Sequence, residues 1–207
     1  MSHRPLVLVA FFYDNYFDDI VKSTRYLFQS ERLGFRTWND EDLDEFANMN
    51  ADPEVMRHFP STLSRDETAH FIHRLQAHFT EHGYAYFVVE TLFDRTFIGF
   101  IGLAYQTYET TFTPAVDIGW RLVPSAWGKG YATEGAQRVL EYGFDTIGLK
   151  SIIATCTIQN TKSERVMRKI GMRKLTLFDH PRLVDFPDYV KCIAYRIESD
   201  EWKAENT

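Results

Sequence analysis

Hydrophobic and polar positions from residue 30 onward change between a period of two and a period near 3.6, which predicts a mixture of strands and helices. Strands are expected at residues 32–38, 84–92, 97–105, 116–123, 151–157 and 190–197, where β-branched and aromatic residues gather. Helices are expected at residues 41–49, 65–82, 134–147 and 161–170, where apolar residues recur at helical spacing. The second and third strands are separated by a short turn and are expected to form a hairpin.

Residues with capping chemistry support these helix limits. Asp40 is expected to cap the first helix and Ser64 the second, which should end at Gly83. The run from Thr161 to Glu164 has the pattern of a capping box. The order is β–α–α, then an antiparallel meander, then β-α-β-α-β, which predicts an α+β or mixed α/β fold with helices on both faces of the sheet.

Residues 1–29 differ from the rest because they are rich in aromatic residues and show little periodicity. They read either as a short strand followed by a helix at residues 14–28, or as a start-site artefact. The sequence therefore divides into an N-terminal extension of unknown role, residues 1–29, and one domain, residues 30–207.

Composition bounds the class of protein. A chain of 207 residues with 44% hydrophobic content can bury a sizeable core. A net charge of −6 without a basic stripe argues against nucleic acid and suits a cationic substrate such as an amine, although acidity also serves solubility. Residues 6–12 form too short an apolar run to span a bilayer, so we expect no membrane partner and a cytoplasmic location. Cys156 and Cys192 read as buried thiols, with a disulfide as the alternative.

The segment Pro124-Ser-Ala-Trp-Gly-Lys-Gly-Tyr-Ala-Thr-Glu134 lies between a predicted strand and a predicted helix. Its glycines allow several backbone N–H groups to converge at a helix start, where the helix dipole favours phosphate. The spacing fits neither a Walker loop nor a dinucleotide-binding fingerprint. Taken alone, the segment is equally compatible with a plain glycine turn.

Other segments, taken in order, carry more information. They are residues 31–36, 52–56, 97–103, 117–122, 127–134, 160–163 and 169–172. Their ordered combination resembles the GNAT acetyltransferase superfamily, and within it the branch of ribosomal-protein N-terminal acetyltransferase-like enzymes (the Rim type). The resemblance implies a mostly antiparallel sheet of six to seven strands with a V-shaped splay between the fourth and fifth, which are residues 116–123 and 151–157 here.

The resemblance also implies acetyl-CoA as cosubstrate. The candidate coenzyme-binding residues are Arg121, Leu122, Val123, Trp127, Gly128, Lys129, Gly130, Tyr131, Ala132, Thr133 and Asn160. Backbone N–H groups of residues 128–133 would hold the pyrophosphate, although Trp127 stands where the family pattern has Arg or Gln. Residues 121–123 would bond the pantetheine arm, and an N–H near Leu122 or Val123 would polarise the thioester carbonyl. Asn160 aligns with a pantetheine-contacting Asn, and a helix cap is the alternative.

The resemblance also gives the catalytic candidates, Asp117 as general base and Ser163 as general acid. A plain serine at the start of a helix explains Ser163 at least as well, so the general acid stays open. Asp117 lies where relatives often carry Glu; a solvated strand carboxylate is the alternative. Met167 stands where many relatives have a Tyr that protonates the leaving sulfur, but a thiol pKa near 8.5 makes that acid dispensable. Glu134 is read as a structural group favourable to the helix dipole. No metal is expected, because the histidine pair His78 and His82 lacks a third ligand.

The resemblance thus implies an N-acetyltransferase that moves an acetyl group to a primary amine by direct attack. A peptide or protein N-terminus is the first choice of acceptor, and a small amine, such as a polyamine or an antibiotic-like amine, is the next. A coenzyme-A-binding regulator without turnover and an unrelated nucleotide-binding module are the competing interpretations. The protein is expected to be a monomer or a homodimer.

Overall fold

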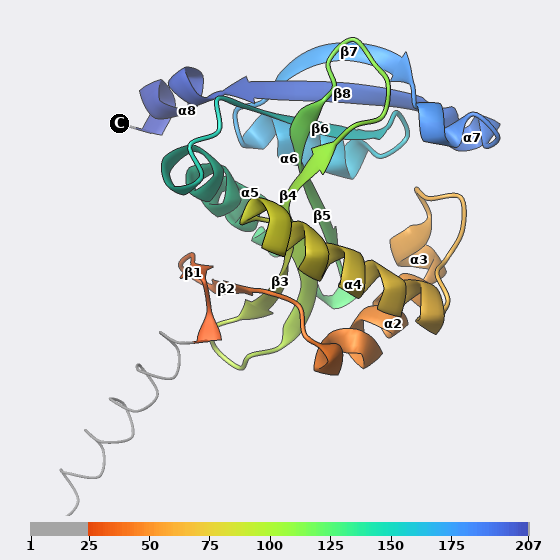
Figure 1. Cartoon of the computed structure of the whole chain (residues 1–207), viewed down its shortest axis with the longest axis vertical. Helices are drawn as coiled ribbons and strands as arrows, with labels where there is room; N and C mark the ends of the chain where they lie inside the picture. Colours follow the sequence, from red (N-terminus) through yellow and green to blue (C-terminus); the bar gives the residue numbers. More distant parts are fainter. Residues whose placement is uncertain (1–24, 207) are drawn as a thin grey trace, which may run out of the picture.

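The computed structural model describes residues 25–206, which form one eight-stranded sheet with helices on both faces (Figure 1). The strands are β1 (Phe28–Gln29), β2 (Leu33–Arg36), β3 (Tyr86–Thr91), β4 (Phe97–Gln106), β5 (Ala115–Leu122), β6 (Ser151–Thr157), β7 (Arg173–Asp179) and β8 (Lys191–Glu198). The helices are α2 (Leu43–Ala51), α3 (Pro53–Met56), α4 (Arg65–His82), α5 (Tyr131–Glu141), α6 (Thr161–Lys169), α7 (Pro187–Val190) and α8 (Ser199–Asn206). Short helical turns are η1 (Asp40–Asp42), η2 (Pro124–Ala126), η3 (Tyr142–Thr146) and η4 (Pro181–Leu183).

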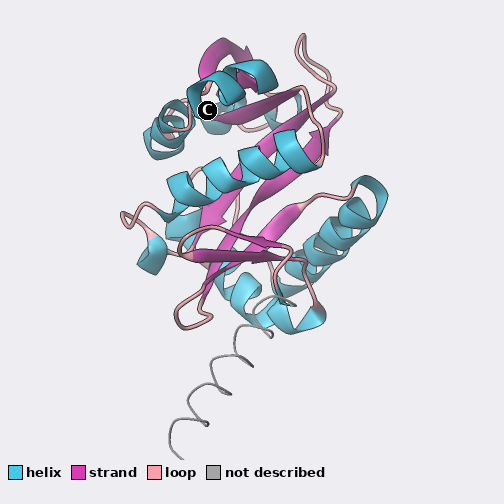
Figure 2. Ribbon diagram, turned by 90° about the vertical axis from the view of Figure 1, so that its left-hand side faces the viewer, coloured by secondary structure: helices cyan, strands magenta, loops and turns pink. Residues whose placement is uncertain are grey.

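The sheet has the order β1-β2-β3-β4-β5-β6-β8-β7, and its neighbours are antiparallel except for β5 and β6. Helices α5 and α6 pack on one face, over a core that includes Phe35, Ile101 and Leu140. Helices α2 and α4 pack on the other face, over a smaller core around Phe46 and Ile72 (Figure 2). The mixed α/β class and the two helical layers are confirmed.

The two parallel strands, β5 and β6, touch at a single position, where Asp117 pairs with Ile153. Beyond that point β6 pairs along its whole length with β8, and β5 continues along β4. Since a parallel ladder would need further pairs, the second half of β5 runs without a partner on its β6 side. This confirms the V-shaped splay and places its vertex at Asp117.

Some elements differ from the sequence prediction. The sheet has eight strands within the described residues rather than six or seven, because the two-residue β1 and the edge strand β7 add to it. On β7 the apolar residues Leu175 and Leu177 are exposed to solvent. Their alternation with polar residues is therefore not the sign of a buried strand face. Helix α5 begins at Tyr131, three residues before the predicted start, and a π turn follows it from Tyr142.

Of the predicted helix caps, some are confirmed by the structure and others are wrong. Ser64 caps α4 and Gly83 ends it with φ of 76°, as predicted. The first cap is Asn39, which accepts from the Glu41 N–H, and Asp40 lies inside the turn that follows. The prediction was therefore wrong by one residue, in a run of residues that all offer a side-chain oxygen.

Residues 1–24 lie outside the described residues, and with them most of the helix predicted at 14–28. Its last residue, Phe28, is in strand β1 and stacks on Phe35 at a ring distance of 4.7 Å. Residues 25–29 therefore belong to the folded domain, which the sequence had been expected to begin at residue 30.

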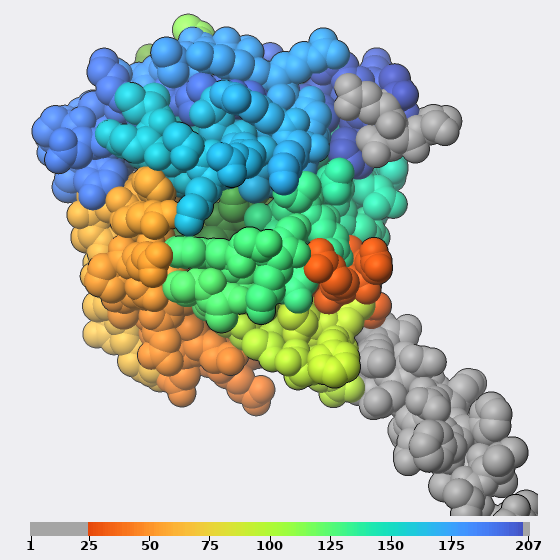
Figure 3. All heavy atoms as spheres, turned by 180° about the vertical axis from the view of Figure 1, so that it is seen from behind, coloured from red at the N-terminus to blue at the C-terminus, as the bar shows by residue number. Residues whose placement is uncertain are grey.

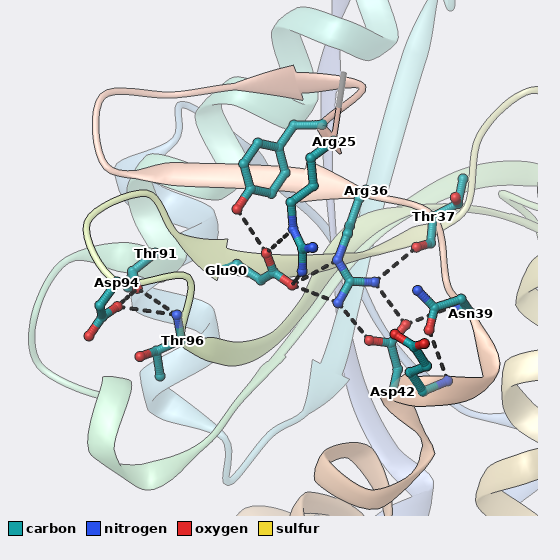
Figure 4. A network of polar contacts seen from close by, with 11 residues as sticks. Arg25, Arg36, Thr37, Asn39, Asp42, Glu90, Thr91, Asp94 and Thr96 are labelled. Carbon is teal, nitrogen blue, oxygen red and sulfur yellow. Dashed lines mark hydrogen bonds and ion pairs between the residues drawn. The ribbon is translucent and has the colours of Figure 1, made fainter. Parts of the chain in front are cut away.

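A buried polar network fixes this N-terminal segment to the sheet (Figure 4). Glu90 on β3 accepts hydrogen bonds from Arg25 Nη2 (2.7 Å), Tyr26 Oη (2.8 Å) and Arg36 Nε (2.8 Å). Arg36 also bonds Asp42 through both terminal nitrogens, at 2.8 and 2.6 Å. Burial raises the pKa of the Glu90 carboxyl, but these donors outweigh burial and hold it below its usual value.

Candidate active site

A cavity of about 450 Å³ opens where the sheet splays. It is lined by the glycine loop after β5, by the first turns of α6, and by α3 and the residues after it. Figure 3 shows the hollow from behind, between the green surface of the loop, the blue surface of α6 and the orange surface near residue 55. The loop singled out in the sequence therefore forms one wall of a cleft.

Gly128 and Gly130 both have left-handed backbones, with φ of 74° and 84°. Other residues adopt this conformation at a cost of about 1–2 kcal/mol. Gly130 is the N-cap of α5 and has no side chain to bond the first amides of the helix. The Thr133 N–H donates to the Gly130 carbonyl at 3.1 Å, whereas the N–H groups of residues 128–132 make no hydrogen bond to any described residue. The loop thus offers free backbone donors of the kind that bind anions, over residues 128–132 in place of the expected 128–133.

Trp127 holds the loop against the end of β5. Its indole Nε1 donates to the Leu122 carbonyl at 2.8 Å. The cations of Arg57 and Lys162 lie over its ring, 5.4 and 4.9 Å from the ring centroid. Trp127 therefore shapes the cleft through contacts with the protein itself.

The register of β4 and β5 decides which backbone groups reach the cleft. The Val123 N–H donates to the Ile98 carbonyl at 3.0 Å, and hydrogen-bonded pairs alternate along an antiparallel ladder. The N–H and C=O groups of Val123 and Arg121 therefore point toward β4. Those of Leu122 and Trp120 point toward the cleft. The expectation that Arg121 and Val123 offer backbone groups to the coenzyme was wrong. The Leu122 N–H remains as a candidate donor to the thioester, and Trp120 joins it at the cleft.

Asp117 is buried at the vertex of the splay, with 8% of its surface exposed. The Tyr86 hydroxyl donates to its Oδ1 at 2.7 Å. Burial raises the pKa of Asp117 to about 6, with the Tyr86 hydrogen bond acting in the opposite direction. The structure thus excludes the alternative of a solvated carboxylate, and a pKa near 6 suits a group that must accept a proton at neutral pH.

A second cavity of about 260 Å³ adjoins the first and reaches Asp117. Both cavities share the residues His58, Phe59, Trp120, Arg121, Asn160 and Ser163. Ser163 therefore lies at the junction, and its hydroxyl makes no hydrogen bond to another described residue. Met167, only 2% exposed, lines the second cavity as an apolar wall and has no proton to give.

Asn160 and Glu134 have clear structural roles. Asn160 Oδ1 accepts from the Ser163 N–H at 3.2 Å and caps α6, in place of the predicted cap at Thr161. Its amide Nδ2 makes no hydrogen bond to another described residue, and Asn160 lines both cavities. Glu134 accepts from Ser30 Oγ at 2.7 Å and from Arg32 N and Nε at 2.8 and 2.7 Å, so it ties α5 to the turn before β2. These donors overcome burial and lower the pKa of Glu134.

The sequence reasoning did not find the side-chain roles of Tyr86, Arg121 and Asn50. Arg121 Nη1 donates to Asn50 Oδ1 at 2.6 Å, and Asn50 is fully buried. Tyr86 lies among the aromatic and β-branched residues of β3, a pattern typical of sheet core. Each of these roles depends on a contact between segments that are distant in the sequence. Such contacts leave no pattern in the sequence from which they could be predicted.

None of the helices within residues 25–206 is both long and apolar enough to cross a membrane. The same residues contain no group of three or more His, Cys, Asp or Glu side chains placed to hold a metal ion.

Comparison with known proteins agrees with this geometry. The family model "Acetyltransferase (GNAT) domain" matches residues 32–173. Over 150 residues the chain is 35% identical to "Uncharacterized N-acetyltransferase YnaD" of Bacillus subtilis, covering 72% of this chain and 84% of that protein. The chain is also similar to a solved GNAT-family acetyltransferase of Bacillus anthracis, with a TM-score of 0.69 and 29% identity over 83% of this chain and 98% of the other.

More distant structures share the fold. A spermidine N-acetyltransferase of Vibrio cholerae, solved with CoA and spermine, has a TM-score of 0.65 at 20% identity, over 83% of this chain and 98% of that one. At this identity the likeness concerns the fold alone.

Proposed function

The chain belongs to the GNAT acetyltransferase family, and we propose that it acetylates a primary amine by direct transfer with Asp117 as the general base. The observation that carries the proposal is the position of Asp117, a buried carboxyl with a pKa of about 6 at the vertex of the splay. GNAT enzymes use acetyl-CoA as acetyl donor, and the first cavity has the groups that such a molecule requires.

The glycine loop would bind the pyrophosphate through the N–H groups of residues 128–132, assisted by the dipole of α5. Trp120 and Leu122 would bond the pantetheine arm, because the register turns their backbones into the cleft. Asn160 Nδ2 would add a donor from the opposite wall. The Leu122 N–H is the candidate donor to the thioester oxygen, where charge develops.

The transfer then requires one proton acceptor and one leaving group. Asp117 takes a proton from the attacking amine, directly or through a water, as nitrogen bonds to the acetyl carbon. The carbon–sulfur bond breaks, and the thiolate leaves with the electron pair. Ser163 lies at the junction of the cavities and can donate its hydroxyl hydrogen bond to the sulfur. A thiolate is a tolerable leaving group, so this assistance is small.

The acceptor is proposed to be an α-amine, such as the N-terminus of a peptide. The resemblance to the Rim branch supports this choice. The chemistry supports it too, because an α-amine has a pKa of about 8 and a lysine-like amine one of about 10. A base with a pKa near 6 deprotonates the first far more readily than the second.

The experiment is acceptor-dependent release of free thiol from acetyl-CoA, measured with N-terminal peptides, amino acids and small amines. Turnover with at least one class of amine supports the proposal. If acetyl-CoA binds but no amine raises thiol release above the rate in its absence, the protein is a coenzyme-binding regulator. If acetyl-CoA does not bind either, the cavity has been misassigned.

A further inference from the structure

We propose that the acceptor amine carries a carboxylate, and that the guanidinium of Arg121 binds it in the second cavity. The inference rests on the proposed acetyl transfer. Among α-amines it favours a free amino acid over the N-terminus of a peptide, whose first residue carries an amide in place of the carboxylate. It makes Arg121 a residue that determines specificity through its side chain.

Arg121 and Asp117 lie on one face of β5, because residues an even number apart share a face of a strand. Four residues separate their Cα atoms by about 13 Å. Gly119 lies between them, and a Cβ there would come within 3.0 Å of the Tyr86 ring. Both side chains line the second cavity, which thus has a base at one end and a cation toward the other.

Arg121 is enclosed without a carboxylate partner. Within residues 25–206, no Asp or Glu oxygen lies within ion-pair distance of it, and its only hydrogen bond is to the neutral amide of Asn50. Its Nε is buried and has no hydrogen-bond partner among the described residues. Desolvation lowers its pKa to about 10. A partly buried cation whose Nε is buried and unpaired is costly unless a ligand supplies the anion.

Arg36 shows how the same fold treats an enclosed arginine when the charge is structural. Asp42 and Glu90 both bond its guanidinium, at distances of 2.6 to 2.8 Å. The charge of Arg36 is thus neutralised by carboxylates of the same chain, whereas Arg121 has no such partner and lines a cavity. The difference points to an external anion for Arg121.

The guanidinium is held in place before any ligand binds. Asn50, which accepts its Nη1 hydrogen bond, is itself bonded through Nδ2 to Thr68 Oγ1 at 3.2 Å. The rings of Phe59 and Phe100 flank it, with centroids 4.3 and 5.3 Å from its central carbon. Nη2 makes no hydrogen bond to a described residue and remains for the ligand. A fixed cation loses little conformational entropy on binding.

The charges around the second cavity favour a zwitterionic acceptor over a polyamine. Asp117 is the only carboxylate among the described residues that line this cavity, and Arg121 is the only Lys or Arg among them. Burial lowers the pKa of His58 and His180, so both imidazoles are neutral at neutral pH and add no charge to the cavity. The extra ammonium groups of a polyamine would meet Arg121 without compensation, whereas a carboxylate would be matched by it.

The test compares acceptors that differ only in the anion: an α-amino acid, its carboxamide, the corresponding phosphonate, and a diamine of similar length. We expect kcat/KM to be at least about tenfold higher for the carboxylate than for the amide, as a charged hydrogen bond is worth roughly 1.5–3 kcal/mol. R121Q should remove this preference, and R121K should restore part of it. R74Q removes the same charge from an exposed position on α4 and should leave the preference intact.

Equal kcat/KM for the acid and its amide, or a preference that survives in R121Q, would overturn the inference. A preference for the phosphonate would overturn the choice of carboxylate, and loss of acetyl-CoA affinity in R121Q would assign the side chain to the coenzyme. Thermal protection by the N-acetylated acid, measured against its amide with coenzyme A present, needs no turnover. Protection lost in R121Q supports the anion site even if no amine is acetylated, and absence of protection in the wild type refutes it.

Discussion

The Tyr86 hydroxyl lies 2.7 Å from Asp117 Oδ1, and this contact joins the phenol on β3 to the carboxyl on β5 across strand β4. Burial and the nearby carboxylate raise the pKa of Tyr86 well above its ordinary value, so it stays protonated and donates. Tyr86 is thus committed to Asp117, which it orients and whose charged form it stabilises. It is a positioning residue for the proposed base.

Tyr86→Phe should lower kcat/KM about tenfold and shift the acidic limb of its pH profile upward. The reason is that the Tyr86 hydrogen bond lowers the pKa of Asp117, so its removal leaves desolvation unopposed by that donor. The measurement is kcat/KM against pH for both proteins. A fall in rate with an unshifted limb would mean that Tyr86 acts only by packing against Phe100, with which it stacks.

Gly130→Asp should reduce acetyl-CoA affinity at least about 100-fold. The new carboxylate would lie against the bound pyrophosphate, in a residue with φ of 84°. Gly83→Asp is the matched control, because its φ is 76°, the space around it is open, and it lies at the far end of α4. Calorimetry of acetyl-CoA binding should separate the two variants. Equal affinities would show that the loop does not hold the pyrophosphate.

Ser163→Ala should lower kcat by less than about tenfold and leave KM for acetyl-CoA unchanged. The serine would assist a leaving group whose pKa is already near 8.5, so little stabilisation is needed. Single-turnover rates with acetyl-CoA would measure the effect on the chemical step. A loss of 100-fold or more would make Ser163 an essential acid and contradict the account of the leaving group.

Glu90→Gln should destabilise the fold by about 3 kcal/mol, since it leaves Arg25 and Arg36 partly unpaired. The pKa of Glu90 is lowered on folding, so its contribution is present above the unfolded pKa near 4.3 and lost as pH falls through the folded one. Urea denaturation at pH 7 and pH 4 would measure both effects. Glu141→Gln removes an exposed ion pair with Arg138 and should change stability by less than about 1 kcal/mol. Similar losses in both variants would refute the role of the network.

The sequence predicted what depends on local chemistry. Ser64 and Gly83 bound a helix because a cap and a left-handed glycine need only their neighbours. The cap at Asn39 was missed by one residue, since several adjacent side chains offer the same oxygen. The direction of the Val123 N–H was not predictable, because it follows from the register with β4.

Long-range contacts account for the rest of the site. Arg121 meets Asn50 across 71 residues of sequence, and Tyr86 meets Asp117 across 31. No spacing or periodicity reports such pairs, so Asp117 could be named as a candidate base, whereas its contact with Tyr86 could not be predicted. Strand β7 was missed for a different reason, because it is an edge strand whose apolar residues Leu175 and Leu177 are exposed.

The central claim is that Asp117 accepts the proton of the acceptor amine, and Asp117→Asn tests it most directly. In the wild type, kcat/KM should fall as pH drops through about 6, where the carboxyl becomes protonated. In the variant, kcat/KM at pH 7.5 should fall by about 10² to 10⁴, with that acidic limb gone and acetyl-CoA affinity unchanged. A variant that keeps both the wild-type rate and the limb near pH 6 would contradict the account.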